Sequence, residues 1–154
     1  MIKLDRILVA TDFSDHSRVA MRYAAALAGQ FNAEVIVAHI VEQIGVLPAV
    51  PPMGEYAHTE PTPALQASHA RDESEKLLRE FNIVNGRVLV ETGRPFLEII
   101  RLARNEEADL IVVGTHGRGA IAHTLLGSVA EKVVRKSPCP VLVVREGEHD
   151  FVMP

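Results

Sequence analysis

The sequence contains a single cysteine, Cys139, and no run of roughly 18 apolar residues. One cysteine cannot form an internal disulfide, which favours a reducing compartment, here the cytoplasm. The N-terminus leads directly into an expected strand and lacks the apolar core of a signal peptide. An excess of basic residues is also missing, because the formal net charge is −4. These absences argue against a nucleic-acid binder and against a membrane partner.

What is present has the composition of one soluble globular domain. The 154 residues are 47% hydrophobic, enough to bury about two thirds of the surface of the unfolded chain. We expect residues 1–146 to form this single domain and the polar residues 147–154 to be a frayed tail. The histidines show no metal-ligand spacing, so the sequence identifies no metal ligands. Cys139, between two prolines, is interpreted as a small buried residue.

Short apolar runs alternate with helical patterns along the chain. Strands are expected at about 4–10, 33–41, 86–91, 108–114 and 140–145, and helices at about 15–31, 63–82, 95–105 and 124–136. This alternation predicts an α/β fold, a parallel sheet with helices on both faces.

The helical patterns also predict which residues begin the helices and which face the core. Ser14 or Asp15 is expected to cap the first helix, and Pro95 suits the first turn of the third. The residues expected to turn inward are Ala20, Tyr23, Ala24, Leu27, Ala28 and Phe31 in the first helix, and Ile99, Ile100 and Ala103 in the third.

A glycine-bearing segment follows the apolar run 108–113. It reads Gly114-x-x-Gly117, nine further residues, then Gly127-Ser128. Gly114 and Gly117 have no Cβ, so they permit positive φ and a close approach of ligand to backbone. Ser128 is expected to cap the next helix, whose N-terminus offers unpaired N–H groups and partial positive charge. The strand, loop and helix start together predict a phosphate-binding site.

Two other glycine motifs do not fit this segment. The Walker A motif needs a lysine before its serine or threonine, and the chain has Leu126-Gly127-Ser128. The window 117–122 fits the dinucleotide pattern G-x-G-x-x-A, but it follows the fourth expected strand. The stretch 136–144 also holds no acid to bind a ribose. We reject both motifs.

The whole pattern, G-x2-G-x9-G-S, resembles the ATP-binding branch of the universal stress protein family. Four further segments match that family in order: the first strand running into Thr11-Asp12, the second strand ending at Val41-Glu42, 129–135 and 138–144. The resemblance covers roughly residues 3 to 145. It implies an open five-stranded parallel sheet of order 3-2-1-4-5, of the Rossmann-like, adenine nucleotide alpha hydrolase-like type. Its ligand crevice would lie where strands 1 and 4 diverge.

The resemblance also implies roles for individual residues. Backbone groups of Ala10 and Val41 would frame an adenine, and Asp12 would accept hydrogen bonds from adenine or ribose, or help to hold a phosphate-bound metal. The remaining residues would contact ribose and phosphates: Thr11 weakly, then Gly114, Thr115, Gly117, Arg118, Gly119, Gly127, Ser128, Val129 and Ala130. The implied ligand is ATP, ADP or AMP, with or without Mg²⁺.

Alternatives stay open for three of these residues. Asp12 also suits a cap-and-turn residue before a helix, and the Thr11 hydroxyl also suits local backbone contacts. Arg118 also fits a solvated loop arginine. Many ATP-binding relatives carry Ser or Thr where this chain has Ala130, which removes one hydroxyl contact.

The leading functional hypothesis is a stress-response regulatory protein that acts through nucleotide occupancy and dimerisation, with an unknown protein partner. The resemblance implies a homodimer formed through strand 140–145. The alternatives are a slow ATPase in the same crevice and an interaction module without nucleotide. We identify no catalytic residue, since neither His116 nor His123 has a recognisable acidic partner. The proline-rich loop 43–62 is expected to be a lid or a dimer contact.

Overall fold

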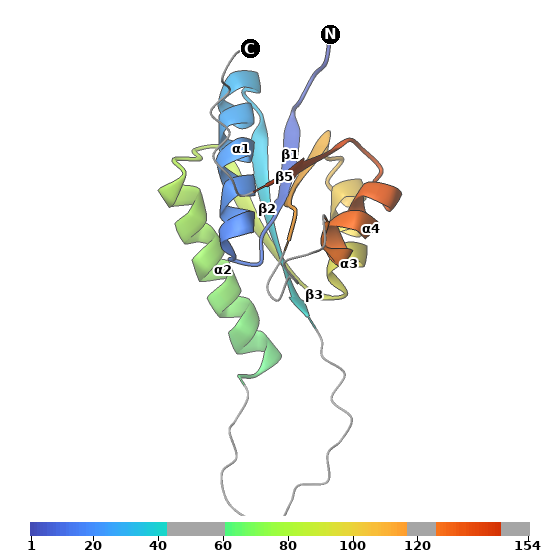
Figure 1. Ribbon diagram of the computed structural model, residues 1–154. Coiled ribbons are helices and arrows are strands. Elements are labelled where there is room, and N and C mark those ends of the chain that lie inside the picture. The colour runs from blue at the N-terminus through green and yellow to red at the C-terminus, as the bar shows by residue number, and fades with distance from the viewer. Residues whose placement is uncertain (43–60, 117–125, 146–154) are drawn as a thin grey trace, which may run out of the picture.

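The strands form one parallel sheet of order β3-β2-β1-β4-β5, which confirms the predicted fold class (Figure 1). The computed structural model describes residues 1–42, 61–116 and 126–145. The strands are β1 (Arg6–Ala10), β2 (Glu34–Glu42), β3 (Gly86–Gly93), β4 (Leu110–Gly114) and β5 (Val141–Val144). The order reverses between β1 and β4, whose register pairs Leu8 with Ile111. The predicted tail 147–154, most of the loop 43–62, and His123 lie outside the described residues.

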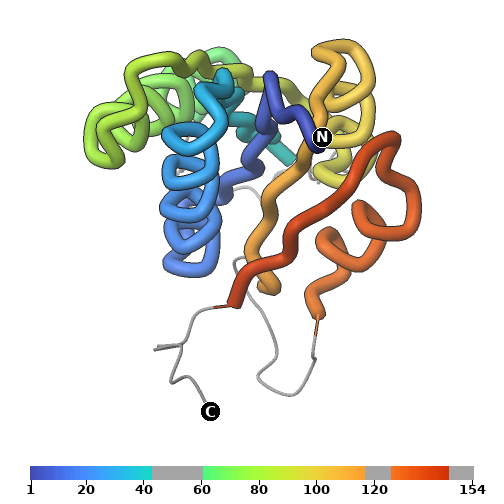
Figure 2. The backbone as a smooth tube through the Cα atoms, turned by 90° about the horizontal axis from the view of Figure 1, so that it is seen from above, coloured from blue at the N-terminus to red at the C-terminus, as the bar shows by residue number. Residues whose placement is uncertain are grey.

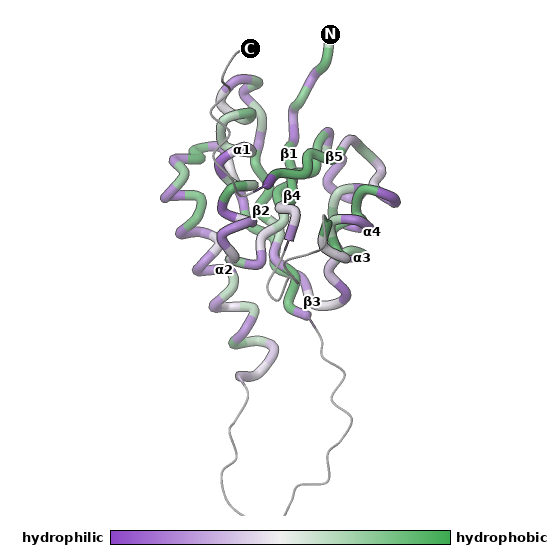
Figure 3. The backbone as a smooth tube through the Cα atoms, viewed as in Figure 1, coloured by the Kyte–Doolittle hydropathy of each residue, from purple (hydrophilic) through white to green (hydrophobic). Residues whose placement is uncertain are grey.

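In the part of the chain that the structure describes, four helices cover the sheet, two on each face (Figure 2). The helices α1 (Asp15–Phe31) and α2 (Pro63–Glu80) pack on one face, and α3 (Pro95–Asn105) and α4 (Ser128–Lys136) pack on the other. Successive strand residues point to opposite faces, so Ile7 and Val9 contact the first pair of helices and Leu8 the second. In Figure 3 the central strands are mostly hydrophobic, whereas the helices beside them mix hydrophobic and hydrophilic residues. No helix in the described part of the chain is long and apolar enough to cross a membrane.

Two predictions about helix faces were wrong in part. In α1 the exposed fractions of Tyr23 and Phe31 are 44% and 41%, whereas Met21, which was not predicted, is fully buried. The buried stripe of α1 is made mostly of alanines, which let the helix approach the sheet closely. In α3 the buried residues are Ile99, Leu102 and Ala103, whereas the prediction had Ile100 in place of Leu102.

The predictions about helix starts are confirmed for α1 and α3 and wrong for α4. Ser14 caps α1, since its Oγ accepts a hydrogen bond from the Ser17 N–H at 3.3 Å, and Pro95 stands in the first turn of α3. The fourth helix, however, begins at Ser128 instead of residue 124. Gly127, with extended backbone (φ −68°, ψ 155°), is the N-cap residue, so Ser128 is the first helical residue and not the cap.

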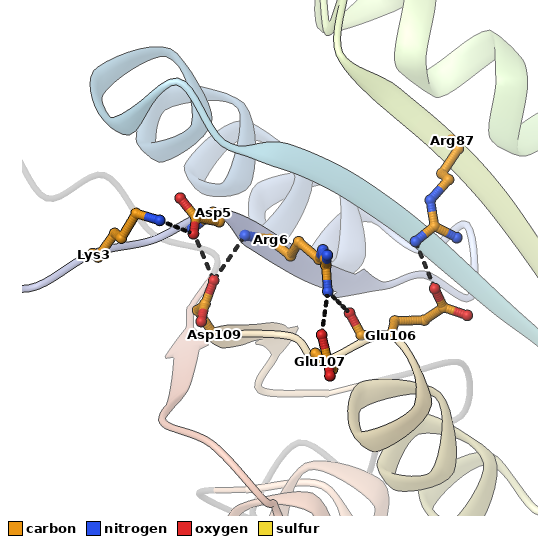
Figure 4. Close-up of polar contacts among 7 residues, drawn as sticks. All are labelled: Lys3, Asp5, Arg6, Arg87, Glu106, Glu107 and Asp109. Carbon is orange, nitrogen blue, oxygen red and sulfur yellow. Dashed lines mark hydrogen bonds and ion pairs between the residues drawn. The ribbon is translucent and has the colours of Figure 1, made fainter.

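The N-terminal edge of the sheet is closed by polar contacts, shown in Figure 4. The Asp109 carboxylate accepts hydrogen bonds from the N–H groups of Asp5 and Arg6 at 2.8 and 2.9 Å. The Arg6 guanidinium donates to the Glu106 carbonyl oxygen at 3.0 Å, and Arg87 pairs with the Glu106 carboxylate at 2.6 Å. These contacts fix the turn between α3 and β4, and the opposite, carboxyl edge carries the candidate site.

Candidate functional site

A cavity of about 660 Å³ lies at the carboxyl edge of the sheet, where β1 and β4 diverge. This is the position at which doubly wound sheets bind ligands. Ten of the thirteen residues predicted for the site line this cavity: Ala10, Thr11, Asp12, Val41, Gly114, Thr115, Gly127, Ser128, Val129 and Ala130. The other three, Gly117, Arg118 and Gly119, lie outside the described residues.

The cavity also has walls that the sequence did not predict. Its apolar lining comes from β2, β4, α3 and the segment just before α4: Ala38, Ile40, Val113, Pro95, Ile99 and Leu126. Polar groups are contributed by Ser17, His39, Glu42, Gln66 and His116. An apolar pocket with a few polar groups is the usual form of a site for a small molecule.

The bend after β1 contains Thr11, whose exposed fraction is 6%. The Thr11 hydroxyl accepts a hydrogen bond from the Phe13 N–H at 3.0 Å and lies 3.0 Å from Ser17 Oγ. Because the Ser17 hydroxyl donates to the Ser14 carbonyl oxygen, the Thr11 hydroxyl donates to Ser17 Oγ. The Thr11 side chain therefore holds the bend together, as its local-contact alternative predicted.

Asp12 takes part in the same bend and also borders the cavity. Its Oδ1 accepts hydrogen bonds from the Ser14 N–H at 3.0 Å and from the Ser14 hydroxyl. This is the cap-and-turn arrangement that the sequence offered as the alternative role for Asp12. The bend thus keeps the Asp12 carboxylate in one orientation at the cavity wall.

Gly114 ends β4 against the first turn of α1. A Cβ built on Gly114 would lie 2.8 Å from the His16 carbonyl oxygen and 2.9 Å from the His16 carbonyl carbon. Gly114 does not adopt the positive φ that a glycine permits, since Gly93 alone among the described glycines has one. Gly114 makes room for the backbone of α1.

Gly127 closes the segment that began at Gly114. Its N–H donates to the Thr115 carbonyl oxygen at 2.7 Å, while the Thr115 N–H donates to the Val144 carbonyl oxygen at 2.8 Å. The two ends of the glycine segment therefore meet beside β5. Because the Gly127 N–H already donates to Thr115, it is not offered to a ligand. Gly127 instead keeps the chain close to the cavity.

The N-terminus of α4 faces the cavity through Ser128, Val129 and Ala130. The first bond of the helix runs from the Glu131 N–H to the Gly127 carbonyl oxygen at 2.9 Å, so the three preceding N–H groups have no acceptor within the helix. With the helix dipole they form a partial positive charge. The described cavity lining holds no lysine or arginine, so these N–H groups are its attractive feature for an anion.

The fold and this cavity define a class of α/β protein with a ligand crevice at the reversal of strand order. The universal stress protein family profile matches residues 3–145, and the chain belongs to that family. A universal stress protein of Methanocaldococcus jannaschii, MJ0531, is 33% identical over 145 residues, which are 94% of this chain and 84% of the relative.

Solved structures agree with this assignment. Universal stress protein UspA from Lactobacillus plantarum superposes with a TM-score of 0.74 at 25% identity, covering 93% of this chain and 99% of that chain. A universal stress protein in complex with cAMP gives a TM-score of 0.69 at 27% identity, covering 94% and 99%. The second of these is therefore a relative that binds an adenine nucleotide.

Proposed function

We propose that this chain is an adenine-nucleotide-binding regulatory protein of the stress response, acting in the cytoplasm as one domain whose output is nucleotide occupancy. The observation that carries the proposal is the meeting of the β1 and β4 ends with the N-terminus of α4 around one cavity of about 660 Å³. The related structure in complex with cAMP supports the choice of ligand class.

The cavity offers two different environments to the two parts of the proposed ligand. The apolar wall beside Ala10 and Val41 would take the adenine, and Asp12 would accept hydrogen bonds from adenine or ribose. The N–H groups of Ser128, Val129 and Ala130 would receive the phosphates, with Mg²⁺ where a triphosphate is bound. Gly114, Thr115 and Gly127 bring the chain close to the ligand, and Gly117, Arg118 and Gly119 keep their predicted role around ribose and phosphates.

Occupancy is favoured over turnover because phosphoryl transfer needs charge clamps and an oriented base. Backbone N–H groups stabilise bound phosphate without activating a nucleophile. The polar groups that face the described part of the cavity include Asp12, whose Oδ1 is already bonded to Ser14. A binding role asks nothing more of Asp12 than the orientation it has.

A homodimer through β5 completes the proposal. β5 is an edge strand, paired with β4 in the described sheet. The carbonyl oxygens of Pro140 and Val144 accept bonds from the N–H groups of Ile111 and Thr115. Backbone groups alternate in direction along a strand, so Val143 turns its N–H to the outer edge, where a second β5 would pair with it.

The test is a melting curve with Mg-ATP, AMP or NAD on the wild type and two Ser128 variants. At roughly 100 times the dissociation constant, a ligand adds about 2.7 kcal/mol of stability, which is about 5–10 °C for a domain of this size. Ser128→Pro removes one N–H donor at a position where proline suits a helix, and the extended Gly127 before it tolerates proline. Ser128→Ala keeps that N–H and removes only the hydroxyl.

We expect Mg-ATP and AMP, but not NAD, to stabilise the wild type, and the ATP shift to shrink in Ser128→Pro and persist in Ser128→Ala. No shift with any nucleotide, in protein shown to be free of prebound ligand, would refute nucleotide binding and favour the interaction module. Phosphate release that Asp12→Ala abolishes would refute occupancy as the output and favour the slow ATPase.

A further inference from the structure

The bend between β1 and α1 is strained. Phe13 has a φ of 64°, in the left-handed region that a bulky side chain rarely adopts. Such a conformation persists only where neighbouring contacts hold it. The bend forms part of the cavity wall through Thr11 and Asp12, so the contacts that hold the bend also position this part of the wall.

His39 on β2 contacts this bend at two residues, Thr11 and Phe13. Its Nδ1 lies 2.9 Å from the Thr11 carbonyl oxygen, and its ring stacks on the Phe13 ring, with centroids 4.5 Å apart and 25° between the planes. A carbonyl oxygen can only accept, so the His39 Nδ1 carries the proton. One side chain therefore contacts the residues immediately before and after Asp12.

The position of His39 follows from the sheet register. Ala10 pairs with Ala38, and the Thr11 N–H still donates to the Ala38 carbonyl oxygen at 2.9 Å. The strand β1 ends at Ala10, whereas β2 continues to Glu42. Beyond the end of β1, the His39 side chain of β2 bonds the Thr11 carbonyl oxygen. It continues the link between the two strands beyond the last backbone pair.

We propose that His39 is a positioning residue for nucleotide binding, which holds the bend of Thr11 to Phe13 so that the Asp12 carboxylate stays at the cavity wall. This inference rests on the proposed nucleotide function. His39 acts here through Asp12, and the proposal gives it no part in a reaction.

The bond and the ring stack can be removed separately. His39→Phe keeps an aromatic ring against Phe13 and removes the donor to Thr11. His39→Asn keeps an amide donor close to the position of Nδ1 and removes the ring. A single lost hydrogen bond corresponds to about a tenfold change in an equilibrium constant. We expect about a tenfold weaker affinity for Mg-ATP in His39→Phe and a loss of about threefold or less in His39→Asn.

A double-mutant cycle with Asp12→Asn separates this role from plain packing, with affinities measured by calorimetric titration of folded protein. If His39 acts through Asp12, then His39→Phe changes the affinity of the Asp12→Asn protein by less than about twofold. Losses that add fully would overturn the proposal. A His39→Phe protein that melts lower but binds Mg-ATP like the wild type would also overturn it.

The free protein gives a second readout. A long-range proton–nitrogen NMR spectrum of the wild type should show the His39 Nδ1 protonated, and a proton on Nε2 alone would overturn the proposal. If the wild type binds neither Mg-ATP nor AMP, the proposed function fails and takes this inference with it. If the wild type binds and His39→Phe binds equally well, only the inference about His39 fails.

Discussion

Substitution of Gly114 by alanine is expected to destabilise the fold, because the new Cβ would meet backbone. The Cβ would lie 2.8 Å from the His16 carbonyl oxygen and 2.9 Å from the His16 carbonyl carbon. Real Cβ atoms essentially never approach other heavy atoms this closely, and neither contact belongs to a flexible side-chain end. The first turn of α1 must therefore move away from β4.

The magnitude follows from the cost of overpacking, typically about 1–3 kcal/mol. For a domain of this size, this corresponds to a melting temperature lowered by about 3–10 °C. Gly29 provides a matched control, since a Cβ added there meets nothing within 4 Å. Gly29 lies in α1, where alanine is favoured over glycine by about 0.5–1 kcal/mol, so Gly29→Ala should raise the melting temperature slightly.

The assay is thermal unfolding of both variants beside the wild type, followed by circular dichroism and calorimetry. The same chemical change should have opposite signs at the two positions. A Gly114→Ala protein as stable as the wild type would refute the packing reasoning. A Gly29→Ala protein destabilised to the same degree would refute it as well, because the effect would then not depend on the contact with His16.

Three further outcomes are expected. Val143→Pro should convert a dimer into a monomer by light scattering at micromolar concentration, because proline removes the outward N–H; Val143→Thr should stay dimeric, and a dimeric proline variant would contradict pairing through β5. Ser14→Ala should cost about 1 kcal/mol through the lost cap, visible as a lower urea midpoint, whereas Ser14→Thr should recover most of the loss. Burial raises the pKa of the Cys139 thiol, so iodoacetamide should modify it more slowly than free cysteine near about pH 8 and at the normal rate in denaturant. The unfolded chain releases that proton first, so Cys139 also contributes a loss of stability as the pH rises above about 8.5.

The sequence could predict the elements of this fold because their patterns are local. Buried parallel strands read as continuous apolar runs, and β1, β2 and β4 are such runs. The strand order came from the family resemblance, since alternation alone fits more than one order. The helix faces could not be predicted fully, because they depend on tertiary contacts. The helix α1 is turned so that Met21 is buried and Tyr23 is exposed, and no local pattern shows that Gly114 packs against His16.

The candidate site divides in the same way. The site residues at the ends of strands and at the start of α4 belong to motifs that the sequence shows. Those that the structure describes line one cavity. Gln66 and Pro95 come from helices that reach the cavity only through the fold, so no spacing in the sequence connects them to it. His39 has a weaker signal, a polar residue within an apolar strand, and its bond to Thr11 depends on the register of β1 and β2.

The bend after β1 shows why two readings of one residue need not exclude each other. The sequence offered Asp12 either as a turn residue or as a ligand contact, and its Oδ1 does make the turn bonds to Ser14. A carboxylate has two oxygens and several acceptor positions, so a turn bond and a bond to a ligand are compatible functions of one carboxylate. The turn bonds restrict rotation of the side chain, which lowers the entropic cost of orienting it when a ligand binds. The structural role of Asp12 therefore favours its proposed binding role.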